Sequence, residues 1–264
     1  MAKWILRLIA FTYLALLLVI PVGIITRRTF EHGVGAVWDS LTTHEAIHAF
    51  QITIFIAICV VVMNTIFGVG AAILLVRHQF PGKRLLNALV DLPLAVSPVV
   101  VGLALILVYG RLTPVGRFLG GHGINIIFAL PGMVMATAFV SLPLMVREVA
   151  PVLEEIGVEQ EQAAWTLGAS GWQTFRKVTL PSIRWATAYG LVLTLARSLG
   201  EFGAVAVVSG RVVDKTQTIT LFVEERFENF DRVAAYSAAF ALAAIAVVVL
   251  LLMNLLRPKE SGES

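Results

Sequence analysis

Six apolar stretches, each long enough to cross a lipid bilayer, constrain this chain more than any other feature of its sequence. The hydrocarbon core of a bilayer is ~30 Å thick, so a helix that rises ~1.5 Å per residue needs about 20 apolar residues to span it. The stretches cover residues 8–25, 52–76, 85–109, 125–146, 185–209 and 233–256. We expect all six to be helices, because an open sheet would leave backbone groups unpaired in lipid.

The composition agrees with a place in the membrane. Hydrophobic residues make up 58% of the 264 residues and charged residues 14%, and the mean hydropathy of +0.86 is high for a water-soluble domain. The sequence therefore predicts an all-α integral membrane protein, with one transmembrane domain over residues 1–264 and a short helical segment at 149–181 between its fourth and fifth spans. The net charge of +3 is small and does not indicate a nucleic-acid partner.

Loop charges predict the orientation. Lys3 and Arg7 precede the first stretch as in a signal peptide, but no small-residue cleavage pattern follows, so we keep this stretch as a helix. With the N-terminus inside, the cytoplasmic segments hold eleven Lys and Arg residues, Arg257 and Lys259 among them, and the outer segments hold eight. By the positive-inside rule both termini and the segment 149–181 are cytoplasmic.

The polar segment at 162–181, QAAWTLGASGWQTFRKVTLP, separates two apolar stretches and has its own helix signals. Helical spacing at 149–156 and 161–167 is followed by Gly168, which suits a left-handed C-terminal cap. Ser170 and Gln173 have the spacing of a capping box, so a new helix should begin there. Pro181 lacks an amide hydrogen and disfavours helical angles at Leu180, which predicts the end of that helix. We expect two short helices joined at a fixed bend.

The side chains of this segment fit a docking surface. Ala163 and Ala164 have little bulk and allow close approach of another surface. Large apolar residues of the kind that dominate interfaces lie around them, namely Trp165, Leu167, Trp172 and Phe175. The same pattern also fits an amphipathic loop that lies against its own helix bundle, and the residues alone leave the two interpretations open.

The segment resembles the signature of permease subunits of binding-protein-dependent ABC importers, which reads Glu-Ala-Ala, three residues, Gly, and later Leu-Pro. In that family the segment is a coupling helix that sits in a groove of a cytoplasmic ATPase subunit. Carried over residue by residue, the resemblance implies that the ATPase contacts are Gln162, Ala163, Ala164, Leu167, Gly168, Ala169, Ser170, Phe175, Leu180 and Pro181.

One position departs from the family pattern. Gln162 stands where the family usually has Glu; it keeps the length and a hydrogen-bond acceptor but loses the charge, which puts a salt bridge to the ATPase in doubt. Glu161 is a poor substitute, because neighbouring residues on a helix point about 100° apart. We expect docking through shape and hydrogen bonds to survive.

Three further stretches resemble the CysW-type sulfate and thiosulfate permease subunit. They are HAFQITIFIA at 48–57, DLPLAVSPVVVG at 91–102 and LARSLGEFGAVAVVSG at 195–210. The resemblance implies ATP-driven import of sulfate or thiosulfate across the inner (plasma) membrane. Permeases for molybdate and related oxyanions share much of the pattern and remain an alternative.

The resemblance also implies an assembly. A second, CysT-like permease would pair with this chain in the lipid, two copies of a CysA-like ATPase would bind inside, and a sulfate-binding protein would dock outside. ATP and magnesium would bind to the ATPase, because the chain has no P-loop of its own: before Gly82-Lys83 the first glycine is replaced by Arg77, and no Ser or Thr follows the lysine. We therefore expect no cofactor on this chain and no enzymatic site.

Charges within apolar stretches are costly and tend to face a partner or a pathway, and this chain has Asp91, Arg197 and Glu201 in such positions. Arg197 and Glu201 share a helix face and either neutralise each other or line an anion path. In the third stretch, Pro93 and Pro98 should bend the helix, which suits a gate or plain packing. The candidate pathway or gate residues are Ser97, Pro98, Arg197, Gly200, Glu201 and Gly203.

One motif points to a different class of protein. His44-Glu45-Ala46-Ile47-His48 matches the H-E-x-x-H zinc signature, in which two histidines bind the metal and the glutamate acts as base, so a membrane zinc metalloprotease is a rival hypothesis. A catalytic zinc needs a third protein ligand, and the histidines of other loops, His32, His78 and His122, have no supporting pattern. The motif also lies in an outer loop, so we expect no metal site. A channel is a third possibility, but a channel would not need a polar segment that couples it to an ATPase.

Overall fold

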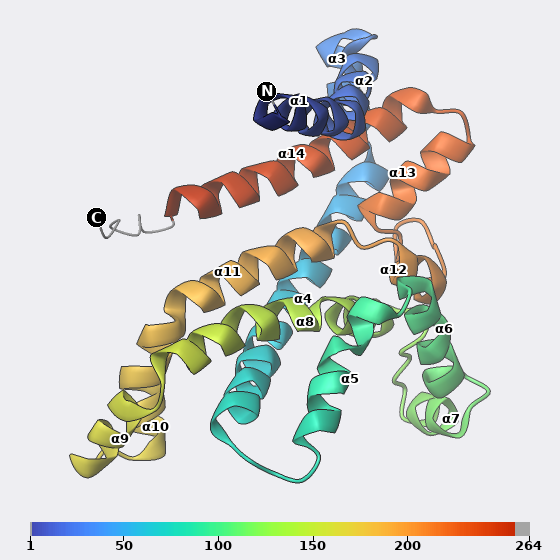
Figure 1. The fold of residues 1–264 in the computed structure, drawn as a ribbon. Coiled ribbons are helices and arrows are strands. Elements are labelled where there is room, and N and C mark those ends of the chain that lie inside the picture. The colour runs from blue at the N-terminus through green and yellow to red at the C-terminus, as the bar shows by residue number, and fades with distance from the viewer. Residues whose placement is uncertain (1, 257–264) are drawn as a thin grey trace.

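The chain folds into helices joined by short loops and turns (Figure 1). The structure is a computed structural model that describes residues 2–256, so Arg257 and Lys259 of the charge count lie outside the described residues. In chain order the helices are α1 (Ala2–Leu14), α2 (Ile20–Phe30), α3 (Gly33–Leu41), α4 (His44–Arg77), α5 (Lys83–Ala95), α6 (Pro98–Tyr109), α7 (Pro114–Gly121), α8 (Leu130–Ile156), α9 (Glu159–Thr166), α10 (Gly171–Thr174), α11 (Leu180–Leu199), α12 (Gly203–Val208), α13 (Ile219–Glu228) and α14 (Arg232–Leu256). π-Helical turns at Ala15–Val19 and Phe175–Thr179 join α1 to α2 and α10 to α11.

Four helical stretches within residues 2–256 are long and apolar enough to cross a membrane, and the bent pair α5–α6 makes a fifth if it is counted as one span. The four are Ile9–Phe30, His44–Arg77, Leu130–Ile156 and Arg232–Leu251. They confirm the all-α membrane class. α11, which covers most of the predicted fifth stretch, is not among them.

The centre of the molecule is formed by α4, α8 and α11, which pack along one another. Two glycines permit this close packing: a Cβ atom on Gly68 of α4 would lie 2.6 Å from Cγ of Met145, and one on Gly190 of α11 would lie 2.8 Å from its Sδ. Met145, on α8, is fully buried. A polar contact adds to the packing, since Asn64 donates to the carbonyl of Ala138 at 3.0 Å and to Ser141 at 2.9 Å. Small residues and buried amides are typical of helix contacts in membranes.

The third apolar stretch is broken into two helices. α5 and α6 meet at an angle of 117°, so the prediction of a bend is confirmed, although the helix stops altogether where we expected only a bend. Val96 and Ser97 are extended, with ψ near 136° and 135°. At Ser97 the cause is the ring of Pro98, which disfavours helical angles in the residue before it. Pro93 lies inside α5 and does not interrupt it.

The fifth stretch, expected as one helix over 185–209, is also interrupted. α11 ends at Leu199 and α12 begins at Gly203. The carboxylate of Glu201 accepts the amide hydrogen of Ala204 at 2.9 Å and so satisfies one of the free donors at the start of α12. A side-chain acceptor at the break makes two short helices possible where the hydrophobic pattern predicts one.

The helix of the fourth stretch, expected at 125–146, begins and ends later in the chain, at Leu130 and Ile156. Residues 125–129, expected at the start of the span, form a loop whose Phe128 amide donates to the carbonyl of Val208 at 2.8 Å. At the other end α8 continues to Ile156, so 149–156 is the last part of this long helix and not a separate piece. Gly157, with φ of +71°, ends it in the left-handed region.

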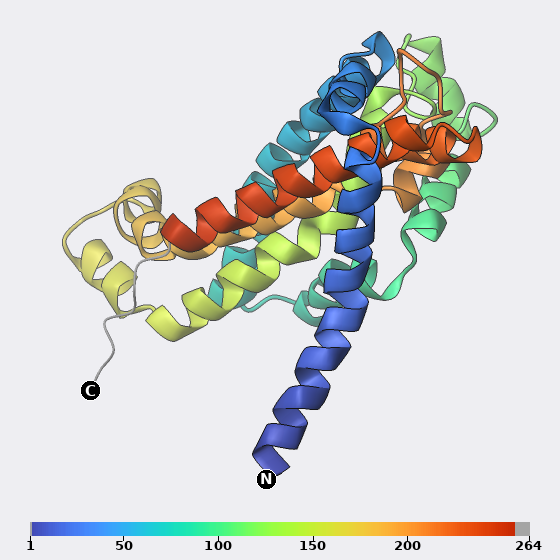
Figure 2. The same ribbon diagram turned by 90° about the horizontal axis from the view of Figure 1, so that it is seen from above.

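The two ends of α4 lie at different faces of the molecule. Its N-terminal end meets α13 and the loop before it, whereas its C-terminal end meets α9 (Figure 1). α3 and α13 are short helices in the connections before α4 and α14, and α9 and α10 project at the ends of α8 and α11. α1 and α2 form one arm, of which α1 extends away from the body (Figure 2). The end of α2 packs on α14, where Thr29 is fully buried and donates to the carbonyl of Tyr236 at 3.1 Å.

Candidate functional site

The polar segment has the predicted bend. α9 ends at Thr166, and Gly168 follows with φ of +84°, the left-handed conformation expected of its cap. The amide of Gly168 donates to the carbonyl of Trp165 at 2.9 Å, and that of Ala169 donates to the carbonyl of Ala164 at 3.0 Å. No atom approaches the place of a Cβ on Gly168 within 4 Å, so the conformation alone requires glycine here.

The second helix begins at the predicted capping box. Gln173 donates its amide hydrogen to Oγ of Ser170 at 3.3 Å, and the Ser170 amide donates to Oε1 of Gln173 at 2.8 Å. Both bonds of the capping box are therefore present, and they fix the entry of α10.

Pro181 does not end the second helix, so that prediction is wrong. The chain stays helical from α10 through the π-helical turn Phe175–Thr179 into α11, and Leu180 donates to the carbonyl of Phe175. A π turn is wider than an α turn, and its position directly before Pro181 takes up the register change that a residue without an amide hydrogen imposes. The second helix is thus continuous with α11.

Large apolar side chains of the segment point into solvent. The exposed fractions are 88% for Leu167, 69% for Trp172 and 53% for Trp165. A shallow groove between α9 and the start of α11 is lined by Ala163, Ala164, Leu167, Lys177 and Pro181, among others. Because exposed apolar side chains of this size mark interaction surfaces, the geometry does not favour the alternative in which the segment covers its own bundle.

Gln162 and Glu161 point in different directions, as their helix positions require. Gln162 is exposed, whereas Glu161 is buried. Oε2 of Glu161 lies 3.0 Å from Nε of Arg77, and its Oε1 accepts a hydrogen bond of 2.8 Å from Thr179. Sequence reasoning missed this contact; the available signal was a lone arginine at the very end of an apolar helix, a position where a charge needs a partner.

The charged residues within the apolar stretches are paired. Nη1 of Arg197 lies 2.6 Å from Oε2 of Glu201, as the neutralising interpretation predicts. Asp91 of α5 forms a two-pronged ion pair with Arg147 of α8, and Asn87 accepts from the same guanidinium at 3.2 Å. The partner of Asp91 was not predicted, because it lies on a helix distant in sequence.

The structure brings together part of the candidate pathway set. α12 packs against α6, and a Cβ on Gly203 would lie 3.1 Å from Cβ of Pro98. The two helix breaks, at Ser97 and at Gly200–Glu201, thus belong to neighbouring elements. Gly200 is exposed, and a Cβ added to it would lie 3.9 Å from the carbonyl oxygen of Ala196.

The family profile described as "Binding-protein-dependent transport system inner membrane component" matches residues 64–262. The chain belongs to this family. The permease is 47% identical to the "Sulfate transport system permease protein CysW" of Synechococcus elongatus over 97% of its length and 90% of that protein. It is 36% identical to the "Sulfate transport system permease protein CysT" of Salmonella typhimurium, over 94% of its length and 89% of that protein.

The permease also shares its fold with a solved transporter. A chain of a bacterial alginate ABC transporter, solved in complex with an alginate pentasaccharide-bound periplasmic protein, superposes with a TM-score of 0.81 over 96% of the permease and 92% of that chain. The sequence identity is 17%, so this match concerns the fold. The predicted family and the ABC importer permease fold are confirmed.

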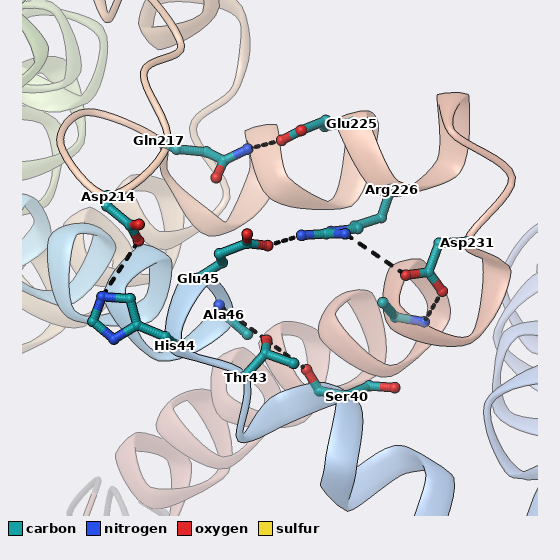
Figure 3. Close-up of polar contacts among 11 residues, drawn as sticks. Ser40, Thr43, His44, Glu45, Ala46, Asp214, Gln217, Glu225, Arg226 and Asp231 are labelled. Atoms are coloured by element: carbon teal, nitrogen blue, oxygen red, sulfur yellow. Dashed lines mark hydrogen bonds and ion pairs between the residues drawn. The ribbon is translucent and has the colours of Figure 1, made fainter.

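The zinc-like motif of the permease has a structural role (Figure 3). Glu45 forms an ion pair with Arg226 of α13, and Asp231 lies 3.9 Å from the same guanidinium. His44 Nε2 lies 3.7 Å from Oδ1 of Asp214. A glutamate held by an arginine is not free to activate water, and no three His, Cys, Asp or Glu side chains within residues 2–256 lie where they could share a metal. The motif ties the start of α4 to α13 and to the loop before it.

Proposed function

We propose that this permease imports sulfate, and with it thiosulfate, across the inner membrane at the expense of ATP hydrolysed by a partner. The observation that carries the proposal is the 47% identity to a CysW protein over nearly the whole chain, well above the 36% identity to a CysT protein. The difference favours the CysW position in a heterodimer, with a CysT-like chain as the second permease. Import of molybdate or another oxyanion is the alternative.

The proposed topology has six spans with both termini in the cytoplasm. The four long apolar helices and the bent pair α5–α6 supply five of them. α11 is the proposed sixth, because it packs along α4, α8 and α14 in the body of the molecule. The whole chain is then one transmembrane domain, with the segment 149–181 on the cytoplasmic side.

The segment from Gln162 to Pro181 is the proposed contact with one of the two CysA-like ATPase copies, which bind ATP and magnesium. Exposed Leu167 and Trp172 would enter the ATPase groove, while Ala163 and Ala164 allow close approach. Because α10 continues into α11, movement of the ATPase would tilt a membrane helix directly. The pathway would then open alternately to a sulfate-binding protein outside and to the cytoplasm.

The proposed gate lies where α6 meets α12. Ser97 and Pro98 form the break of one element, and Gly200, Glu201 and Gly203 form that of the other. Non-helical backbone at membrane depth is tolerated only where it is buried in protein or lines a cavity. Arg197 is held by Glu201, so an anion would meet its charge only if the pair opens.

The test is reconstitution of the permease with its partner chains in proteoliposomes that contain ATP on the cytoplasmic side. We expect uptake of radiolabelled sulfate that needs both ATP and the sulfate-binding protein, and that excess thiosulfate inhibits. A complex that takes up molybdate with its cognate binding protein, and no sulfate, would establish the alternative. Permease without the ATPase should give no uptake; passive flux at the same rate would indicate a channel.

A further inference from the structure

A buried ion pair fastens the coupling helix α9 to the rest of the permease. Nε of Arg77 and Oε2 of Glu161 are 3.0 Å apart, and both side chains are only 10% exposed. Arg77 is the last residue of α4, and Glu161 is the buried residue of α9. The space around the pair measures about 10 Å³, which is at or below the room that one water molecule needs. The contact is therefore direct and nearly dry.

Two hydrogen bonds extend the pair to further elements. Nη1 of Arg77 donates to the carbonyl of Leu153 on α8 at 2.9 Å. Thr179, in the π turn before α11, donates to Oε1 of Glu161 at 2.8 Å. One carboxylate and one guanidinium thus join α9 to α4, to α8 and to the start of α11, the three helices that form the centre of the molecule.

The remaining attachments of α9 are weak by comparison. α9 has eight residues and packs on α10 and on the π turn. Its family-signature position, Gln162, is exposed and neutral. The direct contact between α9 and the long helix α4 is this ion pair. A buried charge pair resists separation, because each charge left alone would be uncompensated.

α4 is suited to carry such a displacement to the other face. Its 34 residues extend about 51 Å at 1.5 Å per residue. At its opposite end Glu45 pairs with Arg226 of α13, beside the loop that holds Asp214 (Figure 3). α4 is thus fixed by an ion pair at each end, to the coupling helix on one face and to the outer loops on the other.

We propose that Arg77 and Glu161 are positioning residues that transmit movement of the coupling helix to α4, with Thr179 orienting the carboxylate. The inference rests on the proposed function, in which α9 docks on an ATPase. Within this subunit, coupling would then depend on the charge of buried Glu161 and not on the exposed, neutral side chain of Gln162.

The test uses the complete importer in proteoliposomes and measures sulfate taken up per ATP hydrolysed. We expect Glu161→Gln to assemble with the ATPase and to keep its basal hydrolysis, while sulfate uptake per ATP falls at least tenfold. Arg77→Lys, which keeps the charge, should retain part of the sulfate uptake per ATP. Arg77→Gln, which removes the charge, should lower it as much as Glu161→Gln does. The matched control is Glu31→Gln, which removes the exposed Arg28–Glu31 pair of the arm and should leave the ratio unchanged.

The outcomes separate the two proposals. If the unmodified complex does not import sulfate, the proposed function fails; if it does and Glu161→Gln keeps the normal ratio, the positioning role is wrong. A parallel fall of uptake and hydrolysis would show a merely structural role and would also overturn it. Should Glu161→Gln fail to assemble, Thr179→Val decides, because it removes only the hydrogen bond to Glu161: a reduced ratio supports the inference and a normal ratio contradicts it.

Discussion

Arg197 and Glu201 form an ion pair of 2.6 Å across the break between α11 and α12, and the two partners differ in exposure. The side chain of Glu201 is 2% exposed and that of Arg197 is 38% exposed. The second oxygen of Glu201 accepts the amide of Ala204, so a single carboxylate serves both the ion pair and the start of α12. The buried carboxylate of Glu201 therefore depends on Arg197 for its counter-charge, whereas the guanidinium of Arg197 can also be solvated by water.

This asymmetry predicts unequal effects of two substitutions. Arg197→Gln leaves a buried carboxylate without its counter-charge and should destabilise the permease by about 3–5 kcal/mol. Glu201→Gln leaves an arginine that can reach water and keeps a side-chain oxygen for Ala204, so we expect about 1–2 kcal/mol. Thermal unfolding in detergent measures both. Equal losses of stability in the two variants would contradict the buried position of Glu201. The double variant should lose less stability than Arg197→Gln alone.

Gly168→Val should abolish uptake while leaving expression intact. Gly168 has φ of +84°, and side chains with a Cβ pay roughly 1–2 kcal/mol there, with more for β-branched ones. The bend between α9 and α10 would be lost, and with it the shape of the docking surface. The matched control is Gly171→Val at the start of α10, where φ is not positive and no atom lies within 4 Å of the added Cβ. Uptake at a normal rate in Gly168→Val would show that the segment does not couple.

If the segment docks through shape, the side chain of Trp172 should contribute more to ATPase binding than that of Gln162. Trp172 is 69% exposed and stacks on Phe175 with ring centres 5.5 Å apart, which holds it in place for a partner. Trp172→Ala should weaken ATPase binding by about 2 kcal/mol, roughly 30-fold. Gln162→Ala should change it less than about twofold. Titration of the purified ATPase against permease in nanodiscs measures both, and the reverse order would point to a polar contact as the main anchor.

The packing of α11 on α8 predicts that Gly190→Ala is destabilising. The added Cβ would lie 2.8 Å from Sδ and 3.2 Å from Cα of Met145, and such overpacking costs about 1–3 kcal/mol. Met145→Ala in the same chain should relieve most of this cost, so the two substitutions should not be additive. Gly70→Ala, where nothing lies within 4 Å, is the control. If the two substitutions changed the unfolding temperature by strictly additive amounts, the two residues would not be in contact.

The H-E-x-x-H motif predicts a clear negative result for zinc. Glu45 pairs with Arg226 and not with a metal, so purified permease should contain far less than one zinc per chain by elemental analysis. Glu45→Gln should change uptake by less than about threefold, because the lost pair is partly exposed. Stoichiometric zinc together with loss of activity in Glu45→Gln would overturn this view and restore the metalloprotease hypothesis.

Local features of the polar segment could be predicted because each depends on neighbouring residues only. A glycine after a helical pattern gives the cap at Gly168, and Ser170 with Gln173 gives the capping box. Pro181 was misjudged for the same reason: its ring and missing amide normally stop a helix, but the π turn Phe175–Thr179, which ends two residues earlier, lets the helix continue. Such a turn depends on packing against other elements, which local sequence does not encode.

The sequence by itself determined the helical class, the apolar stretches, the change of direction at Pro98 and the bend of the polar segment, because hydrophobicity and backbone sterics act locally. Only the tertiary structure decided which charges meet. Arg77 finds Glu161, Asp91 finds Arg147 and Glu45 finds Arg226 across elements far apart in the chain. Those pairs follow from helix packing and from the cost of leaving a charge unpaired away from water, and neither is visible until the helices are assembled.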